Sequence, residues 1–164
     1  MDFYKELGAL IFGSRLKRIS DRFLSDVNKV YTQLEIPFDA SWFPVFYLLD
    51  KEERISLIEV SDKLEVSHSA ISQLVTNLER KKLVKTEKDP EDGRKRLITL
   101  TNEGLEVKNK AKAVWDALQG AMGELLMEGT HSQHLLKGFD ELENNLDQKD
   151  LKERVLEKIG VSSQ

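Results

Sequence analysis

The sequence predicts a mainly α-helical protein with one small β-hairpin. Apolar residues recur at three- and four-residue steps over most of the 164 residues, which is the helical period. Between residues 83 and 100 the pattern changes to two extended runs, which are separated by an Asp-Pro-Glu-Asp-Gly sequence typical of a turn. The chain contains no cysteine, so disulfides, thiol catalysis and thiolate metal sites are excluded.

The first predicted helix covers residues 3–34 and ends before Pro37. Its apolar residues lie on one side, so the helix needs a partner helix to bury them. A second, short helix follows. Asp39 or Ser41 can serve as its N-cap, and Pro44 is tolerated in its first turn.

Two further helices are predicted before the hairpin. Ser56 and Glu59 form a capping-box pattern that opens the third helix, and Ser67 can cap the fourth, which runs to about Lys81. Either Lys82 then adopts a left-handed conformation or the fourth helix ends in another way. Helical spacing places the following residues of the fourth helix in the core: Ala70, Ile71, Leu74, Val75 and Leu78.

The order of helix, short turn, helix and hairpin is the layout of a winged helix-turn-helix. The runs 83–88 and 94–100 are the two predicted strands, and Gly93 is expected to supply the positive φ of their turn. The formal net charge of the chain is −4, yet residues 63–101 contain nine Lys and Arg against six Asp and Glu. A basic segment in an acidic chain is typical of a module that meets nucleic-acid phosphates.

Two long helical segments complete the chain. Thr101 is expected to cap a fifth helix that runs to about Glu128, and Gly129 is expected to end it. Thr130 and Gln133 form a second capping-box pattern, which predicts the start of a final helix.

Three segments of the chain carry a family resemblance. Residues 64–75 read LEVSHSAISQLV, Leu78 and Glu79 follow, and residues 92–104 read DGRKRLITLTNEG. This combination strongly resembles the MarR family of bacterial transcriptional regulators, and the wing pattern of the last segment is its most specific part. The resemblance extends through the flanking helices and so covers nearly the whole chain. It implies a homodimer that binds a short inverted-repeat operator, often released by a small ligand.

The resemblance also implies a domain organisation. Residues 1–164 form a single MarR-like chain, in which residues 39–101 are the winged helix-turn-helix lobe that binds DNA. Residues 1–36 and 102–160 supply the dimerisation helices, which interlock with those of the second protomer.

The N-terminal part is similar to a narrower group of proteins. Residues 10–18 (LIFGSRLKR) and 42–45 (WFPV) are similar to the regulator half of chains that fuse a MarR-like domain to an acetyltransferase of the GNAT type. The sequence contains no Arg/Gln-x-x-Gly-x-Gly/Ala loop for coenzyme A and no catalytic constellation. We therefore expect no enzyme activity and no cofactor in this chain.

The candidate DNA-binding residues lie on the fourth helix and on the hairpin. They are Ser67, His68, Ser69, Ser72, Gln73, Asn77, Arg80, Lys81, Lys88, Asp92, Arg94, Lys95 and Arg96. Gln73 is the best candidate for base reading, because an amide can pair with adenine N6 and N7. Arg94 can enter a narrow minor groove, with Asp92 orienting it or a neighbouring arginine. The lysines and other arginines are expected to meet phosphates.

Each of these assignments has a plainer alternative. Ser67 serves foremost as an N-cap, and His68 is as readily an exposed residue with no specific contact. The charged hairpin residues can form a solvated turn and a charged sheet edge. We expect no metal site: no His or Cys stands at ligand spacing from His68, and His131 and His134 are more readily two exposed polar residues.

A small-molecule effector is a further expected partner. Trp42, Phe43 and Phe46 can line an apolar pocket, although an aromatic cluster on a short helix is more often plain core. Arg15 and Arg22, with Arg18 between them, can anchor an acidic ligand or form a solvated face.

The sequence therefore predicts a DNA-binding regulator, foremost a ligand-responsive repressor. Its expected partners are double-stranded DNA and a second copy of the chain. Charges in the first residues and the absence of a long apolar stretch predict no signal peptide and no membrane partner, hence a cytoplasmic protein. The resemblance to MarR regulators implies a bacterial protein that joins the nucleoid when bound to DNA. Two alternatives stay open: a winged-helix module for protein contacts, and a regulatory subunit of a separate acetyltransferase.

Overall fold

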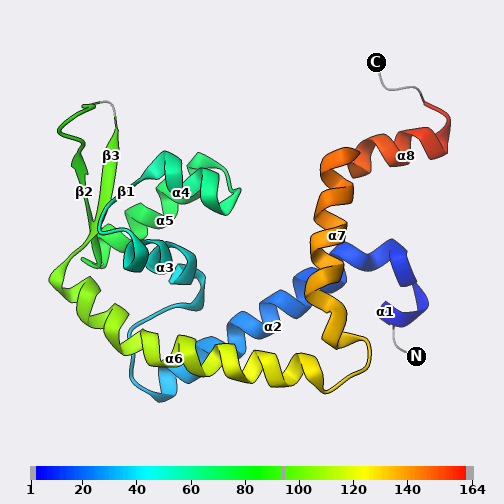
Figure 1. Ribbon diagram of the computed structural model, residues 1–164, viewed down its shortest axis with the longest axis horizontal. Helices are drawn as coiled ribbons and strands as arrows, with labels where there is room; N and C mark the ends of the chain where they lie inside the picture. The colour runs from blue at the N-terminus through cyan, green and yellow to red at the C-terminus, as the bar shows by residue number, and fades with distance from the viewer. Residues whose placement is uncertain (1–2, 94, 162–164) are drawn as a thin grey trace. The chain divides into compact units, whose positions relative to one another are not determined.

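The computed structural model describes residues 3–93 and 95–161 (Figure 1). The chain divides into two compact units after Trp115, and each is described separately below. Among the described residues, no helix is both long and apolar enough to cross a membrane.

The N-terminal helix is interrupted near its start, which corrects the prediction of one continuous helix over residues 3–34. A short helix, α1 (Phe3–Glu6), is followed by the 3₁₀ turn η1 (Gly8–Ile11) and then by the long helix α2 (Phe12–Gln33). Gly8 has φ +53°, a left-handed conformation that ends the first helical turn. Glycine adopts this conformation without steric cost, and the apolar period alone does not reveal it.

Asp39 opens the second helical segment, which decides between the two predicted caps. Its Oδ1 accepts a hydrogen bond from the Ser41 backbone N–H at 2.8 Å, at the start of the 3₁₀ turn η2 (Ala40–Trp42). The helix α3 (Phe43–Lys51) continues directly from this turn, with a proline in its first turn as predicted.

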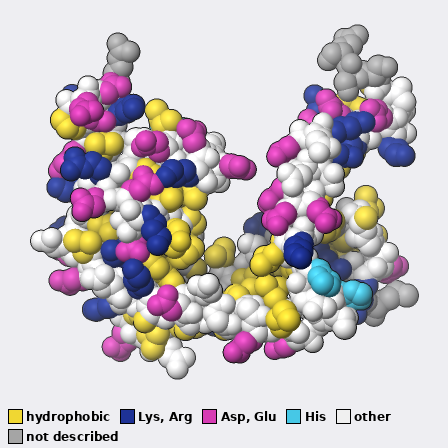
Figure 2. Space-filling view, viewed as in Figure 1, with side chains coloured by type: hydrophobic (Ala, Val, Ile, Leu, Met, Phe, Trp, Pro, Cys, Tyr) yellow, Lys and Arg dark blue, Asp and Glu magenta, His cyan; other side chains and the backbone are white. Residues whose placement is uncertain are grey.

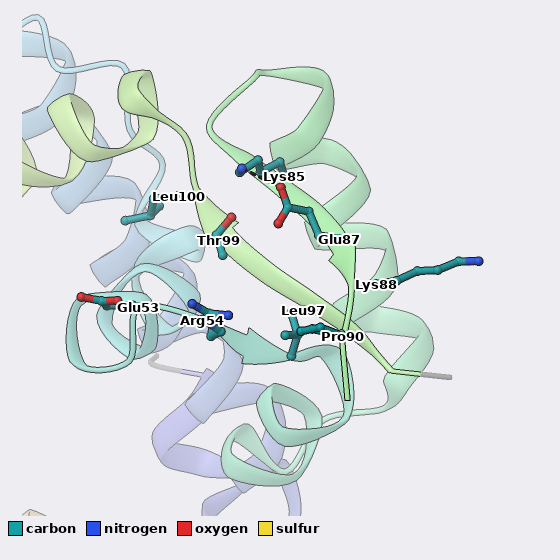
Figure 3. A pocket seen from close by; sticks show the side chains of 9 residues that line it. All are labelled: Glu53, Arg54, Lys85, Glu87, Lys88, Pro90, Leu97, Thr99 and Leu100. Carbon is teal, nitrogen blue, oxygen red and sulfur yellow. Dashed lines mark hydrogen bonds and ion pairs between the residues drawn. The ribbon is translucent and has the colours of Figure 1, made fainter. Parts of the chain in front are cut away.

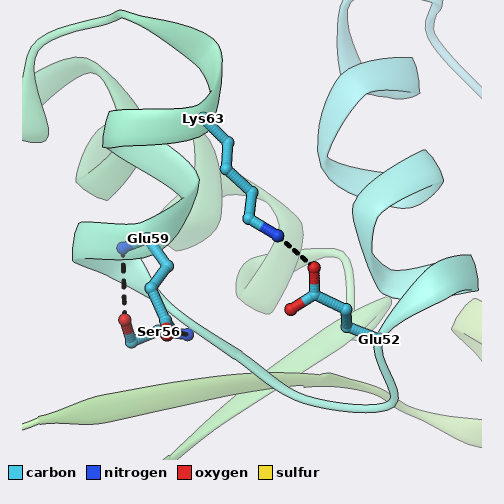
Figure 4. A network of polar contacts seen from close by, with 4 residues as sticks. All are labelled: Glu52, Ser56, Glu59 and Lys63. Atoms are coloured by element: carbon cyan, nitrogen blue, oxygen red, sulfur yellow. Dashed lines mark hydrogen bonds and ion pairs between the residues drawn. The ribbon is translucent and has the colours of Figure 1, made fainter.

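The third and fourth helices begin as predicted. Ser56 and Glu59 form the capping box at the start of α4 (Leu57–Leu64): the Glu59 N–H donates to Ser56 Oγ at 3.2 Å, and the Ser56 N–H donates to Glu59 Oε2 at 2.9 Å (Figure 4). These two hydrogen bonds lower the pKa of the Glu59 carboxyl. Ser67 Oγ accepts from the Ala70 N–H at the start of α5 (His68–Arg80).

Helix α5 ends on a left-handed lysine, which confirms one of the two predicted alternatives. Lys82 has φ +59°, its N–H donates to the Glu79 carbonyl at 2.8 Å, and the Leu83 N–H donates to the Leu78 carbonyl at 3.0 Å. This pair of bonds is a Schellman motif, which satisfies the last free carbonyls of the helix. Glu65 ends α4 in the same conformation.

The structure contains a three-stranded antiparallel sheet of order β1-β3-β2, where the sequence predicted only a hairpin. Strands β2 (Val84–Lys88) and β3 (Arg96–Leu100) form the predicted hairpin, and β1 (Ile55–Ser56) pairs with β3 through Ile55 and Ile98. The two-residue β1 is too short to show an alternating pattern.

The hairpin turn is organised by Asp89 rather than by Gly93. Asp89 Oδ1 accepts hydrogen bonds from the N–H groups of Glu91 and Asp92, and the Asp89 N–H donates to the Lys95 carbonyl at 3.0 Å. The turn thus spans the residues between Asp89 and Lys95, longer than a two-residue Asp-Gly turn. Gly93 is not left-handed, so the positive φ expected there is wrong.

Thr101 caps the long helix α6 (Asn102–Met127) as predicted, because its Oγ1 accepts from the Gly104 N–H at 3.0 Å. The second predicted capping box is wrong. Gln133 Nε2 donates to the Thr130 carbonyl, and Ser132 Oγ donates to the Leu126 carbonyl at 2.7 Å, so these side chains close the end of α6.

The C-terminal unit continues with three helical segments. They are the 3₁₀ turn η3 (Ser132–His134), α7 (Leu135–Gln148) and α8 (Leu151–Ile159). The break between the last two is marked by Asp150, whose Oδ1 accepts from the Glu153 N–H at 2.7 Å.

The core of the first unit is aromatic at its centre. Phe38 packs against Tyr31, Trp42, Phe46 and Trp115, with ring centroids between 5.0 and 6.0 Å apart. The Trp115 Nε1–H donates to the Tyr31 hydroxyl at 3.1 Å, which satisfies both buried polar groups. Through Tyr31, Phe46 and Trp115, this cluster holds α2, α3 and α6 together.

Candidate nucleic-acid interface

Helix α5 has one buried face and one exposed polar face. Ile71, Val75 and Leu78 are buried, as predicted from their spacing. Ser69 and Gln73 are exposed on the other side, one helical turn apart. The helix is therefore anchored by its apolar residues and presents its polar residues outward.

Most predicted contacts on α5 are accessible. Ser67, His68, Ser69, Gln73, Arg80 and Lys81 are exposed, whereas Ser72 and Asn77 are half-buried. Ser67 acts as the N-cap, and its Oγ lies 3.1 Å from Ser69 Oγ. Lys81 lies at the end of the helix with its Nζ 5.4 Å from the centre of the Trp42 ring.

Two exposed residues of α5, Ala70 and Thr76, were not among the candidate residues predicted from the sequence. Ala70 is exposed, not buried in the core as predicted, and Leu74 is only half-buried. Thr76 is also exposed, and its Oγ1 donates to the Ser72 carbonyl at 2.8 Å. The signal for Thr76 was present, because it lies three residues from Gln73 on the same helical face. A methyl group, such as that of Ala70, is suited to contact a thymine methyl.

The register of the hairpin places its charged residues on defined faces. The pairs Val84–Leu100, Thr86–Ile98 and Lys88–Arg96 share one face. Val84 and Ile98 are buried, and the Thr86 hydroxyl donates to Glu79 of α5 at 2.5 Å, so this face packs on α5. The cations Lys88 and Arg96 extend it toward the tip.

The remaining predicted wing residues lie in or near the turn. Lys95 is exposed, and its charge helps to lower the pKa of Glu59. Asp92 is half-buried, and its backbone carbonyl accepts from the Lys95 N–H at 2.8 Å. Arg94 lies outside the described residues. The visible face of the winged lobe carries Lys and Arg interspersed with Asp and Glu (Figure 2).

The opposite face of the sheet carries a shallow hollow of about 540 Å³. Arg54 extends over this face beside Leu97 and Thr99, and Lys85 donates to Glu87 Oε1 at 2.6 Å (Figure 3). Cations and carboxylates both line the hollow, so it does not present one sign of charge.

The predicted effector residues do not form one site, because the aromatic residues belong to the core cluster or pack on it and the arginines lie elsewhere. Trp42 and Phe46 are buried in the aromatic core, and Phe43 packs on Trp115 with ring centroids 5.1 Å apart. Arg15 and Arg22 are exposed on α2, and the described contacts join neither to these aromatic residues.

Trp42 nevertheless borders a hollow of about 480 Å³ between the end of α5 and the start of α6. Lys81, Lys82 and Lys110 contribute cations to its lining, and Glu103 and Glu106 contribute carboxylates. Five charged residues line the hollow beside four apolar ones, so it is more polar than a typical small-molecule site.

An ion cluster joins the helix before the sheet to the helix after it. The Asp50 carboxylate accepts from Lys108 Nζ at 2.7 Å and from Lys112 Nζ at 2.9 Å. These two hydrogen bonds, first that of Lys108, lower the pKa of Asp50 to about 2. The cluster therefore holds α3 against α6 through charged groups.

Most of the winged lobe is similar in sequence to known proteins. Residues 37–95 match the model of the MarR family. The HTH-type transcriptional regulator SarZ of Staphylococcus haemolyticus (strain JCSC1435) is 29% identical over 93 residues, which are 56% of this chain and 63% of that relative. The chain thus spans less than two thirds of the length of the curated relative it matches.

Solved structures share the fold. The Staphylococcus aureus MepR–DNA complex has a TM-score of 0.66 and 20% identity, over 81% of this chain and 96% of that chain. Reduced AbfR bound to DNA has a TM-score of 0.65 and 22% identity, over 90% and 98%. At these identities the likeness concerns the fold, and it confirms the predicted class: mainly α with a small β wing.

Proposed function

We propose that this chain is a transcriptional regulator of the MarR family that binds duplex DNA as a homodimer, and the match of residues 37–95 to the model of that family supports this proposal. The observation that carries this proposal is the placement of two groups of side chains. The polar face of α5 and the cations of the hairpin both belong to the winged lobe, and neither is covered by its core. That arrangement suits a helix in the major groove with a wing on the adjoining backbone or minor groove.

Base reading is assigned to the middle of α5. Gln73 is exposed there, between Ser69 and Thr76 on the same face. A glutamine amide can donate to N7 and accept from N6 of adenine, which distinguishes this base from the others in the major groove. Ser69 and Thr76 can assist through their hydroxyl groups, and Arg80 is placed to meet a phosphate.

The wing supplies the remaining contacts with the DNA backbone. Lys88 lies directly opposite Arg96 in the hairpin, and like charges in this position destabilise a sheet. A phosphate bound at Lys88 would offset the charge of this lysine, which favours a role for this end of the hairpin at the DNA backbone. Arg94 is assigned to the minor groove on the basis of the sequence pattern alone.

The dimer is assigned to helices that the single chain leaves uncovered. Phe12, Ile19, Phe23 and Val30 of α2, and Leu34 at its C-cap, are all exposed by more than a third. They are separated by steps of seven and four residues, which is the spacing of a seam between packed helices. A second copy of the chain can cover this stripe and place the two α5 helices about one DNA turn apart, ~34 Å.

A small ligand is the proposed release signal for repression. The hollow beside Trp42 is bordered by Lys81 and Lys82, which terminate α5. A ligand bound there would act directly on the end of the helix that reads DNA. If it favours another spacing of the two lobes, it shifts the population away from the DNA-bound form.

The proposed function is tested by replacing Arg94 with alanine and measuring the affinity for a duplex selected by the parent protein. Arg94→Ala should weaken binding by roughly tenfold or more while the fold and the dimer are retained, because a minor-groove arginine contributes charge and fit together. Binding as tight as that of the parent would refute the wing assignment. Weak binding by the parent that does not respond to salt would favour a protein-interaction module instead.

A further inference from the structure

A chain of three polar side chains joins α5 to both strands of the hairpin. The Thr86 hydroxyl of β2 donates to Glu79 Oε1 of α5 at 2.5 Å, and it accepts from Arg96 Nη2 of β3 at 2.8 Å. A hydroxyl has a single proton, so the carboxylate and the guanidinium use its donor and its acceptor respectively. Both bonds involve a charged partner and are therefore stronger than bonds between neutral groups.

Glu79 and Arg96 each lie at a position where their own charge is unfavourable. Glu79 lies in the last turn of α5, where the negative end of the helix dipole disfavours a carboxylate. Arg96 lies opposite Lys88, a pairing of like charges. The two hydrogen bonds through Thr86 offset both unfavourable effects, because they connect the Glu79 carboxylate to the Arg96 guanidinium.

These three hydrogen-bonded side chains also form the link between α5 and the hairpin that lies farthest from the buried base of the hairpin. At the base of the hairpin, Val84 and Ile98 are buried against the core. Among residues 3–93 and 95–161, the bond from Thr86 to Glu79 is the one hydrogen bond that connects α5 to the two hairpin strands. Without it, the tip would be attached to the helix through the buried base alone.

We propose that Glu79, Thr86 and Arg96 form a positioning chain that holds the wing at a fixed angle to α5. In this assignment, which rests on the proposed function, Arg96 serves DNA binding through Thr86 and Glu79, while Lys88 contacts phosphate. This revises the expectation that both cations meet the DNA backbone. A wing held in place before binding loses less conformational freedom when helix and wing engage the duplex together.

The test compares variants by affinity and by salt dependence on a duplex selected by the parent. Thr86→Val removes the hydroxyl but keeps the β-branched shape and every charge. It should weaken binding roughly tenfold, the scale of a lost hydrogen bond to a charged group, and leave the slope of log affinity against log salt unchanged. Thr86→Ser, which restores a hydroxyl, should recover most of the affinity.

Arg96→Ala and Lys88→Ala form a matched pair, because the two residues are directly opposed in the hairpin. Arg96→Ala should weaken binding with an unchanged salt slope, and the double variant with Thr86→Val should bind no more weakly than Arg96→Ala alone. Lys88→Ala should reduce the steepness of the slope by about one, as expected for the loss of a phosphate contact.

Two outcomes separate this proposal from the proposed function. If the parent binds duplex DNA with a steep salt response, Thr86→Val binds equally well and Arg96→Ala reduces the slope by about one, then Arg96 is a phosphate contact and the positioning chain is wrong. If the parent itself shows no salt-dependent binding, both proposals fail. Urea unfolding of each variant identifies any loss of affinity that comes from a destabilised lobe.

Discussion

The Asp50 carboxylate is 12% exposed and accepts hydrogen bonds from Lys108, which is 13% exposed, and from Lys112. Its pKa in the folded protein is about 2, against an ordinary value of 3.8. The folded state therefore favours the charged carboxylate more than the unfolded state does. The resulting stabilisation is complete above pH 3.8 and disappears as the pH falls through about 2.

Asp50→Asn should lower the free energy of unfolding at neutral pH by about 2 kcal/mol or more, since one pKa unit corresponds to ~1.4 kcal/mol and Lys108 loses its partner. The difference from the parent should shrink between about pH 4 and pH 2. Urea unfolding across this range measures it. Asp26→Asn, which removes an exposed pair with Lys29, is the control and should have a smaller effect. A difference that persists to pH 2 would show that the Asp50 charge is not its cause.

Residues whose partners lie within a few positions could be predicted from the sequence. Ser56 with Glu59, Ser67 and Thr101 each cap a helix start as their local pattern indicates. The same pattern failed at Thr130, where Ser132 binds the Leu126 carbonyl and takes over the end of α6 instead. Competition between neighbouring acceptors decides such cases, and the pattern does not record it.

The start of α6 lies against the end of α5, and Gly104 makes this approach possible. A Cβ atom on Gly104 would lie 1.9 Å from the Leu83 carbonyl oxygen. Thr101 Oγ1 donates to the Lys82 carbonyl at 2.6 Å at the same junction. The occurrence of glycine at position 104, the last residue of the segment 92–104, therefore has a steric explanation.

Gly104→Ala should destabilise the protein by ~1–3 kcal/mol, because the helix start or the Leu83 backbone must move to admit the methyl group. Gly120→Ala is the matched control in the same helix, since its added Cβ meets no atom within 4 Å. It should stabilise the protein by ~0.5–1 kcal/mol through helix propensity. Thermal or urea unfolding of both variants tests this, and equal effects of the two substitutions would refute the steric account.

Helices were predicted from the sequence better than the sheet. The apolar period and the caps located α3 to α6 within a few residues, because both signals are local. Strand β1 and the link from Thr86 to Glu79 depend on partners far along the chain or on another element. Of the candidate site, the exposed polar face of α5 was predictable, whereas the position of Arg96 in a hydrogen-bonded chain was not.

At the scale of the whole molecule, exposed apolar side chains support the proposed dimer. The stripe on α2 includes Phe23, which is 40% exposed, and the C-terminal unit exposes Leu136, Leu151 and Ile159 by more than half. Apolar surface repeated along helices at seam spacing is typical of an interface between chains.

Phe23→Glu should convert a dimer into a monomer or shift the equilibrium strongly toward it, because two carboxylates would enter the seam. Sedimentation velocity measures the mass, with Ser25→Glu, an exposed neighbour off the stripe, as the charge-matched control. A parent that sediments as a monomer would contradict the assigned interface.

The most direct measurement of the central claim is selection of preferred sequences from random duplex DNA, repeated at several salt concentrations. A dimer with one winged lobe per protomer should enrich an inverted repeat with half-site centres about 10 base pairs apart. Its affinity should fall steeply as salt rises, because phosphate contacts release counterions. Recovery of no common sequence together with a flat salt response would contradict the account.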